Sequence, residues 1–431
     1  MKNKLVAFCI TAILMSTATL SFGAGFKISE QGAKAMGMAN AFTAQADDPS
    51  ALAYNPAGIA FQKGTQVQVG STTILVPQTE FEGTTKLSGA TSVSEKANRD
   101  IFIAPTFYAT TSLESMPLSF GLGVNSFHPL AKRWDTSSSF RDSIQSLSIK
   151  PINFQPTVAY RFDDMKLSVA GGIDITYAQV SLQKMAYAQL PAALGGAYAE
   201  LGAIGADTTA TGYGYNFGLQ WKPLSNVSFG AAYRSKIKLG LEGDATYLAT
   251  TATGQSAALG LGPKTIKTSG ATDITLPDAL SLGVAYKPID QLTLEFDAER
   301  TGWSSYNSLE LRFGTPLAAF NGKVDPKNWK DVWAYRFGAQ YALTPKVDLR
   351  AGYAYDTGPS PNDTVGPELP DADRHNFSLG AGFHNDFGSI DLAYMWVHWV
   401  DRTIDPGVNA KEAGTFKSDA HLLAAAVTLK F

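Results

Sequence analysis

The chain has 431 residues and a formal net charge of -3, from 35 Lys and Arg against 38 Asp and Glu. Charged residues make up 17%, against about 25% in an average soluble domain, while 45% are apolar. These values exclude the basic surface of a nucleic-acid-binding protein and the composition of a disordered chain. The one cysteine, Cys9, excludes a disulfide framework and a cysteine-based metal site.

The first 23 residues have the pattern of a secretory signal peptide. Two lysines precede an apolar run over 5–20, and small residues alternate over 21–24. We predict cleavage after Gly23, which leaves a mature chain that begins at Ala24 and contains no cysteine. Because no cationic stop follows the run, an N-terminal membrane anchor is disfavoured. No later segment has the roughly 20 consecutive apolar residues of a membrane helix.

Residues 24–63 have a different character from the rest of the chain. Alanine, glycine and methionine dominate this leader, and no alternation of apolar and polar residues is sustained. Short helical turns are the expected structure, for example one that begins around Pro49.

From about residue 64 to Phe431, apolar residues alternate with small or polar ones, which is the signature of strands with two different faces. In 291–299, for example, Leu292, Leu294 and Phe296 oppose acidic and hydroxyl side chains. Short turns and long connections alternate along the chain. The short turns lie at 163–164, 222–225, 287–290, 344–346 and 385–388, and the long connections lie at 77–98, 128–146, 185–209, 247–266, 314–330, 357–373 and 401–416.

Alternating short and long connections are typical of transmembrane β-barrels rather than of soluble sandwiches, which also alternate. We count about fourteen strands, and an even number places both ends in the periplasm. The sheet must close, because a backbone group left unpaired in lipid costs several kcal/mol. The alternating last strand, 422–431, ends on Phe431 and resembles the terminal signal read by the outer-membrane assembly machinery.

We therefore predict an all-β protein: a transmembrane antiparallel β-barrel of about fourteen strands over 64–431, in the outer membrane of a Gram-negative bacterium. Residues 24–63 either hang in the periplasm or fold back as a plug, and their small residues favour a helical hatch inside the lumen. The expected partners are outer-membrane lipid and lipopolysaccharide, and we expect a monomer.

The leader also carries short motifs: Ala24-Gly25-Phe26, Gly37-Met38-Ala39-Asn40-Ala41, Ala46-Asp47-Asp48 and Asn55-Pro56-Ala57. Further motifs are Leu276-Pro277-Asp278 and the segment 369–374. Together these motifs resemble the FadL family, the outer-membrane transporters of long-chain fatty acids and their hydrocarbon-uptake relatives. The resemblance covers essentially the whole mature chain.

The resemblance implies that an apolar ligand passes into the membrane through a side opening where the third strand kinks inward, near the Asn-Pro-Ala element. We place the third strand at 117–127, where Gly121 and Gly123 tolerate a bulge, although they could simply ease strand curvature. The predicted hatch and lateral gate is Phe26, Asn55, Pro56, Ala57, Gly121 and Gly123.

Two long loops are the predicted apolar capture surface, although their side chains could equally pack the loops together. The residues are Phe127, Leu130, Trp134, Phe140, Met185, Tyr187, Leu190 and Leu194. A fatty-acid carboxylate needs a basic partner, because charge-assisted hydrogen bonds are the strong ones. By strand parity and by the resemblance, the candidates are Lys184, Arg234, Lys236, Arg336 and Lys327, although lumen acids such as Glu295 and Asp297 could pair with them.

An enzyme is not indicated, since the five histidines lack metal-ligand spacing and no nucleophile elbow or nucleotide fingerprint occurs. No cofactor or metal is expected. The predicted function is facilitated diffusion of hydrophobic molecules, with long-chain fatty acids as the first candidate ligands. A hydrocarbon channel of the same family, a general porin and a structural or adhesin barrel are the alternatives.

Overall fold

The computed structural model describes residues 25–76, 78–189, 198–249, 265–314, 321 and 324–431. The predicted signal peptide and the predicted capture residues Leu190 and Leu194 lie outside these ranges. No helix in the described ranges has the length and apolar character needed to cross a membrane.

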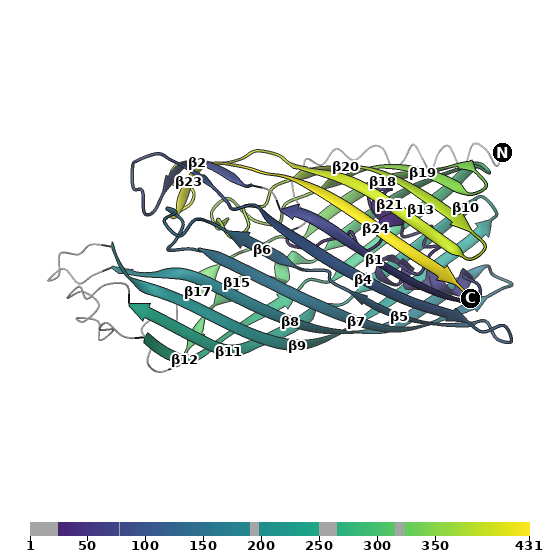
Figure 1. Ribbon diagram of the computed structural model, residues 1–431, viewed down its shortest axis with the longest axis horizontal. Coiled ribbons are helices and arrows are strands. Elements are labelled where there is room, and N and C mark those ends of the chain that lie inside the picture. Colours follow the sequence, from purple (N-terminus) through teal and green to yellow (C-terminus); the bar gives the residue numbers. More distant parts are fainter. Residues whose placement is uncertain (1–24, 77, 190–197, 250–264, 315–320, 322–323) are drawn as a thin grey trace.

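The wall is a closed antiparallel β-barrel in which fourteen strand passages follow chain order and β1 pairs with β24 (Figure 1). Three passages are interrupted and consist of two strands each. The passages are β1 (Thr65–Val76), β4 (Asp100–Ser112), β5 with β6 (Leu118–Asn125, Leu130–Arg133), β7 (Ser146–Phe162), β8 (Leu167–Gln189), β9 (Tyr198–Leu224), β10 with β11 (Val227–Arg234, Ile237–Ala249), β12 with β13 (Thr265–Leu276, Ala279–Ile289), β14 (Leu292–Thr301), β18 (Val332–Thr344), β19 (Val347–Asp356), β20 (Arg374–Asn385), β21 (Gly388–Trp399) and β24 (Asp419–Lys430).

The two ends of the barrel differ as the sequence predicted. Tight turns join the strands at the end where the C-terminus lies, and long connections lie at the other end (Figure 1). A small sheet of connection strands lies at the long-loop end. It consists of β22 (Arg402–Ile404), β23 (Glu412–Lys417), β2 (Glu80–Thr85) and β3 (Val93–Lys96), while β16 (Arg312–Phe313) pairs with β12, and β15 (Ser308–Glu310) pairs with β17 (Val324–Pro326).

The wall reverses its polarity along its height. Towards the short turns, Tyr213 and Phe217 of β9 are exposed on the outside, and Asn216 is buried inside, as expected for lipid outside and a polar lumen. Towards the long loops, Leu239 of β11 points into a buried apolar cluster, and Lys238 is exposed outside. The lower half is therefore built for lipid, and the upper half encloses an apolar lumen in water.

Residues 25–63 form the hatch, which lies inside the barrel towards the short-turn end (purple in Figure 1). Its helices are short: α2 (Ala33–Met36), α3 (Ala51–Tyr54) and the 3-10 helix η1 (Pro56–Phe61). Another short 3-10 helix, η3 (Trp303–Ser305), follows β14. Small hatch residues allow the backbone to lie against the wall, where glycines leave the matching space: a Cβ on Gly218 would lie 2.5 Å from the Asn55 amide oxygen.

Two connections that the sequence placed in loops belong to the wall. The predicted loop 185–209 is largely strand, since β8 continues to Gln189 and β9 begins at Tyr198. Part of the predicted loop 128–146 is β6, which continues the third passage after a break at 126–129. The polar or small residues at these positions marked strands above the membrane, where outward-facing apolar side chains are not required.

Candidate functional site

An apolar cavity of about 540 Å³ lies in the upper lumen, within the roughly 300–1,000 Å³ range of small-molecule sites. Strands β8, β9 and β12 supply its walls, and the connections at 325–329, 368–369 and 411 contribute to its lining. Its apolar lining includes Leu130, Ile149, Val180, Ile274 and Leu309. The apolar part of this space accepts an aliphatic or aromatic chain.

The floor of this cavity is an aromatic cluster around Phe26, the first aromatic residue of the hatch. The Phe26 ring lies 4.6 Å from Trp303 and 5.9 Å from Trp329, measured between ring centroids. Tyr306 lies 4.9 Å from Trp329 and closes the cluster. The wall thus holds Phe26 between the upper cavity and the space below.

Charged side chains line the mouth of the cavity, and most of them are paired. Lys327 forms ion pairs with Glu368 and, at 2.8 Å, with Asp325, which also binds Lys411 at 2.8 Å. Burial opposes ionisation of the Glu368 carboxyl, but the Lys327 ammonium holds the pKa of Glu368 below its usual value. The Lys327 ammonium is therefore already committed to protein carboxylates.

Lys184 differs from its neighbours at the mouth. It faces the cavity from β8, and its ammonium makes no hydrogen bond or ion pair with any residue in the described ranges. An unpaired cation beside an apolar cavity can bind the anionic head of an amphiphile. Of the predicted anchors, Lys184 and Lys327 line this cavity, and of these two only Lys184 has no hydrogen bond or ion pair in the described part of the chain.

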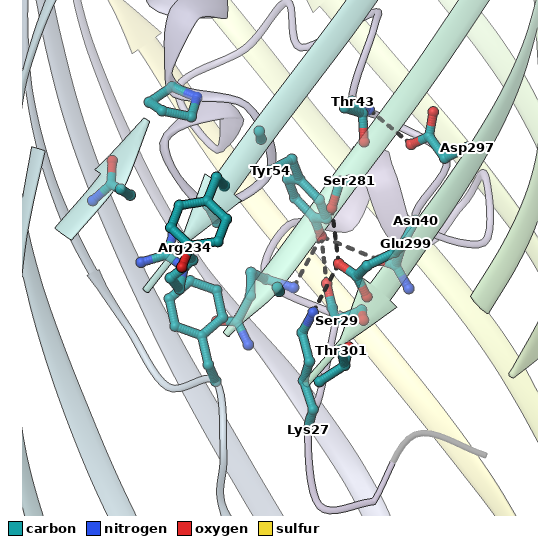
Figure 2. Close-up of a pocket in the computed structure, with 18 of the residues that line it drawn as sticks. Lys27, Ser29, Asn40, Thr43, Tyr54, Arg234, Ser281, Asp297, Glu299 and Thr301 are labelled. Carbon is teal, nitrogen blue, oxygen red and sulfur yellow. Dashed lines mark hydrogen bonds and ion pairs between the residues drawn. The ribbon is translucent and has the colours of Figure 1, made fainter. Parts of the chain in front are cut away.

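A smaller, polar cavity of about 50 Å³ lies beside the hatch at mid-lumen (Figure 2). Lys27 of the hatch reaches Glu299 of β14 at 2.7 Å, and Arg336 of β18 reaches the same carboxylate at 3.3 Å. Arg234 of β10 points into this cavity from the opposite side and pairs with buried Asp174 of β8. The two predicted arginine anchors, Arg234 and Arg336, thus pair with acidic side chains of the lumen. This pairing is the alternative that the sequence had left open.

Lys236 is not in the lumen, contrary to the parity prediction. Its side chain is half exposed on the wall and lies 3.7 Å from Asp278, and it lines neither cavity. The strand passage breaks between Arg234 and Ile237, and both of these residues face inward. The extra residue at the break reverses the parity that a continuous strand would have kept.

The third strand passage has a window on one side. β4 pairs with β5 only from Phe107 to Ser112, and in the described ladder the earlier residues of β4 have no partner on this side. Above the gap, the Asn98 amide donates to the Arg133 carbonyl at 2.7 Å. A cavity of about 140 Å³ lies behind this window and shares Phe26, Leu130 and Leu369 with the upper cavity.

The hatch supplies the hydrogen bonds that the broken third strand lacks. The Gln31 amide donates to the Ser126 carbonyl at 2.7 Å and accepts from the Ser126 amide at 3.3 Å. The Ile28 amide donates to the Phe127 carbonyl at 2.8 Å. These contacts keep the broken strand's backbone paired, which matters because unpaired groups at membrane depth are costly.

The break lies above the two glycines that the sequence singled out. Gly121 and Gly123 sit in continuous ladders with both β4 and β7. A Cβ on Gly121 would lie 2.6 Å from Leu52 of the hatch, so this glycine makes room for α3 rather than for an opening. Pro129 is the last residue of the break and is the sequence signal that could have located it.

Asn55, Pro56 and Ala57 join the hatch to β9 rather than to the window. The Asn55 amide donates to the Leu219 carbonyl at 2.9 Å, and the Asn55 oxygen accepts from the Ala57 amide at 3.2 Å, which begins η1. The Asn-Pro-Ala element therefore orients the second half of the hatch against the wall.

Two carboxylates of β14 form the other main attachment, which sequence reasoning missed. Asp297 accepts from the Phe42 and Thr43 amides, both at 2.9 Å. Glu295 accepts from the next two amides of the chain, at 2.6 and 3.0 Å. We call Glu295 and Asp297 the carboxylate clasp. Two acids on the lumen face of one strand were the available signal.

The predicted capture residues divide into three groups. Leu130 and Tyr187 line the upper cavity. Trp134 and Phe140 are buried in the packed core of the loop sheet, and Met185 is buried beside the loops, so these three hold the loops together. Phe127 lies at mid-lumen, where its ring stacks under Arg234 at 4.1 Å. No cluster of three or more His, Cys, Asp or Glu in the described ranges could hold a metal ion.

Comparison with known proteins gives one matching family model, described as outer membrane protein transport protein (OMPP1/FadL/TodX), over residues 14–431. An outer membrane protein of Neisseria meningitidis serogroup B is 29% identical, with 98% of each chain covered. A long-chain fatty acid transport protein of Escherichia coli O6:H1 is 24% identical, over 91% of this chain and 90% of its own. A solved structure of a Pseudomonas aeruginosa FadL homologue superimposes with a TM-score of 0.82, at 22% identity, over 95% of this chain and all of that one.

Proposed function

Because the chain belongs to the FadL/TodX family of bacterial outer membrane β-barrels that transport hydrophobic compounds, and whose members are channels and not enzymes, we propose that its ligands are long-chain fatty acids. The observation that carries the choice of fatty acid over neutral hydrocarbon is the Lys184 ammonium beside the 540 Å³ apolar cavity. This ammonium has no hydrogen-bond or ion-pair partner among the residues that the structure describes. A hydrocarbon ligand would leave this cation without a partner.

The driving force for capture is burial of the acyl chain. Each methylene taken from water into the cavity gains about 0.8 kcal/mol, so capture needs no energy input. Lys184 binds the carboxylate at the mouth, while Leu130 and Tyr187 contact the chain. Because Lys327 is already paired with Asp325 and Glu368 at the mouth of the cavity, Lys184 is the head-group anchor in this proposal.

The exit in this proposal is the window between β4 and β6. Displacement of Phe26 from its aromatic cluster joins the upper cavity to the 140 Å³ cavity behind the window, because Phe26, Leu130 and Leu369 line both. The outer surface of β4 at this height is apolar, with Ile101 69% and Ile103 58% exposed. A ligand that leaves here enters lipid rather than the periplasm.

The position of the hatch inside the barrel disfavours a general porin. The hatch is tied to the wall by the carboxylate clasp and by Asn55, which blocks a water-filled path through the lumen. Single-channel recording is expected to show no steady current for the intact protein. The first 23 residues act in this proposal as an export signal, and the strand that ends at Phe431 is recognised by the outer-membrane assembly machinery.

The head-group proposal is tested by binding to purified protein in detergent. Calorimetry with oleate and with the alcohol of the same chain length separates charge from chain burial. Lys184→Ala is expected to weaken oleate binding about tenfold, which corresponds to about 1.4 kcal/mol, and to leave the alcohol unchanged. Lys184→Arg keeps the charge and should retain most of the affinity.

Lys150→Ala is the matched control, since Lys150 is exposed on the outside of β7. Equal losses for oleate and the alcohol would mean that Lys184 acts through packing. Tighter binding of toluene than of oleate would replace the fatty-acid proposal with hydrocarbon uptake.

A further inference from the structure

A second interruption in the wall lies between β9 and the passage formed by β10 and β11. Pairing runs from Val227↔Leu224 to Arg234↔Asn216 and resumes only at Glu242↔Thr209. Between these points, the described ladder assigns no pairs across residues 210–215 and 235–241, which we call the seam. The Ser235 amide, which donates to the Tyr215 carbonyl at 2.9 Å, marks its lower end.

The seam arises because the neighbouring hairpin bends as a unit. The pairs Arg234↔Ala279 and Ile237↔Leu276 keep the same register on either side of the bend, so β10–β11 and β12–β13 turn inward together. The stretch 235–241 is also one residue longer than the stretch 210–215 that it faces. The mismatch therefore appears at the border with β9 and not within the hairpin.

Apolar packing replaces the missing ladder. A Cβ on Gly212 would lie 2.6 Å from Cγ2 of Ile237, and a Cβ on Gly214 would lie 2.8 Å from its Cγ1. The two glycines thus let the Ile237 side chain rest directly on the inner face of β9. Above the two hydrogen bonds between Ser235 and Tyr215, closure therefore depends on the packing of Ile237 and Leu239 rather than on a row of ladder hydrogen bonds.

The space behind the seam is small in the closed state, about 10 Å³, which is room for about one water molecule. A narrow cavity is lined by Ser235 and Ile237 from the seam and by Phe127 and His128 from the broken third strand. It shares Phe127, His128 and Arg234 with the polar cavity of Figure 2. His128 is only 7% exposed, and its Nε2 atom has no hydrogen-bond partner in the described structure.

The outer side of the seam differs chemically from the window. Tyr213 is 70% exposed, and the rings of Tyr215 and Tyr233 lie 6.2 Å apart, as in the aromatic belt at a membrane–water interface. Lys236 is half exposed and Lys238 is exposed at the same place. The window opens instead between apolar side chains.

We propose that the seam is a second lateral port, gated by Ile237, through which a single-chain anionic amphiphile enters the membrane with its head at the interface. The inference rests on the proposed function and adds a route to it. Opening requires a new rotamer of Ile237 and a swing of the hairpin about 235–236 and 277–278. The chain then enters lipid while the head remains beside Lys236 and Lys238.

The port can be locked without other thiols, because the single cysteine lies at position 9 in the predicted signal peptide. The Ser235 hydroxyl oxygen lies 2.8 Å from a Cβ built on Gly214, which suits a disulfide between Gly214→Cys and Ser235→Cys. The test measures uptake of radiolabelled oleate by cells that lack their own transporter. Ala131→Arg, which fills the window, provides the background in which the second route is seen.

In the window-filled background, the reduced double-cysteine protein is expected to retain measurable uptake, and oxidation should lower it at least fivefold, reversibly on reduction. A disulfide between Ala339→Cys and Ala351→Cys, directly paired on β18 and β19, is the control and should change nothing. Equal uptake in the oxidised and reduced forms, or no uptake at all once the window is filled, would overturn the port. Neither result depends on the Lys184 binding measurement, whose failure would instead remove the proposed ligand class.

Discussion

Replacing Asp297 by alanine is expected to release the hatch loop from the wall. The two amides of Phe42 and Thr43, each 2.9 Å from one Asp297 oxygen, would lose their acceptor in a buried site. A hydrogen bond to a charged group contributes about 1.5–3 kcal/mol, so the two bonds together contribute about 3–6 kcal/mol. Glu295 keeps its own bonds to the Ala44 and Gln45 amides, and this remaining attachment offsets part of the loss.

We take about 2 kcal/mol as the lower limit, which raises the population of the released loop about 30-fold. The assay is the rate at which a bulky maleimide labels Ala44→Cys, a buried position of the loop, in the otherwise cysteine-free mature protein. Asp244→Ala is the matched control, because the Asp244 side chain is exposed on the outside of β11.

Unchanged labelling of a folded Asp297→Ala barrel would refute the role of the clasp. If Asp297→Ala migrates as a folded barrel on gels of unheated samples and yet labels within about threefold of the parent, the clasp does not hold the hatch. If Asp244→Ala accelerates labelling equally, the faster labelling results from the loss of a negative charge anywhere on the protein and not from loss of the clasp.

Gly121→Leu should destabilise the folded barrel by about 1–3 kcal/mol through overpacking against Leu52, measurable as a lower thermal midpoint, whereas Gly123→Ala meets only ordinary contacts and should not. Burial raises the pKa of Glu412 in the loop sheet from its usual 4.5 to about 8, so its contribution to stability is complete below pH 4.5 and is lost as pH rises through 8. Hydrogen-exchange protection factors of the loop sheet, which are corrected for the intrinsic rise of amide exchange with pH, should therefore fall over that range, and Glu412→Gln should remove this fall. Mass spectrometry of the mature protein should give a chain that begins at Ala24, and an intact leader would contradict the signal prediction.

Some of the architecture follows from sequence alone, for a physical reason. A strand in a lipid-embedded barrel has one face in hydrocarbon and one in a polar lumen, and this forces the alternation seen over 291–299 and 422–431. The same constraint distinguishes tight turns from long connections. The motifs of the leader resembled a family, and the match over residues 14–431 confirmed that resemblance.

Two sequence predictions were wrong near interruptions of the wall. Lys236 was placed in the lumen because a continuous strand alternates, but the break after Arg234 turned it outward. Likewise, Gly121 was assigned to the opening, although the ladder there is intact and the gap lies at 126–129. A local pattern contains no information about a one-residue bulge whose cause is the packing of the next strand.

The sequence by itself determined that the chain crosses the membrane as strands, which end carries the loops, and which segment is too small and irregular to be part of the wall. Only the tertiary structure decided which charges are paired. Arg234, Arg336 and Lys327 pair with carboxylates of other elements, and Lys184 forms no such ion pair within the described ranges. Ion pairing between residues far apart in sequence depends on the closure and stagger of the whole barrel, which no local pattern of residues contains.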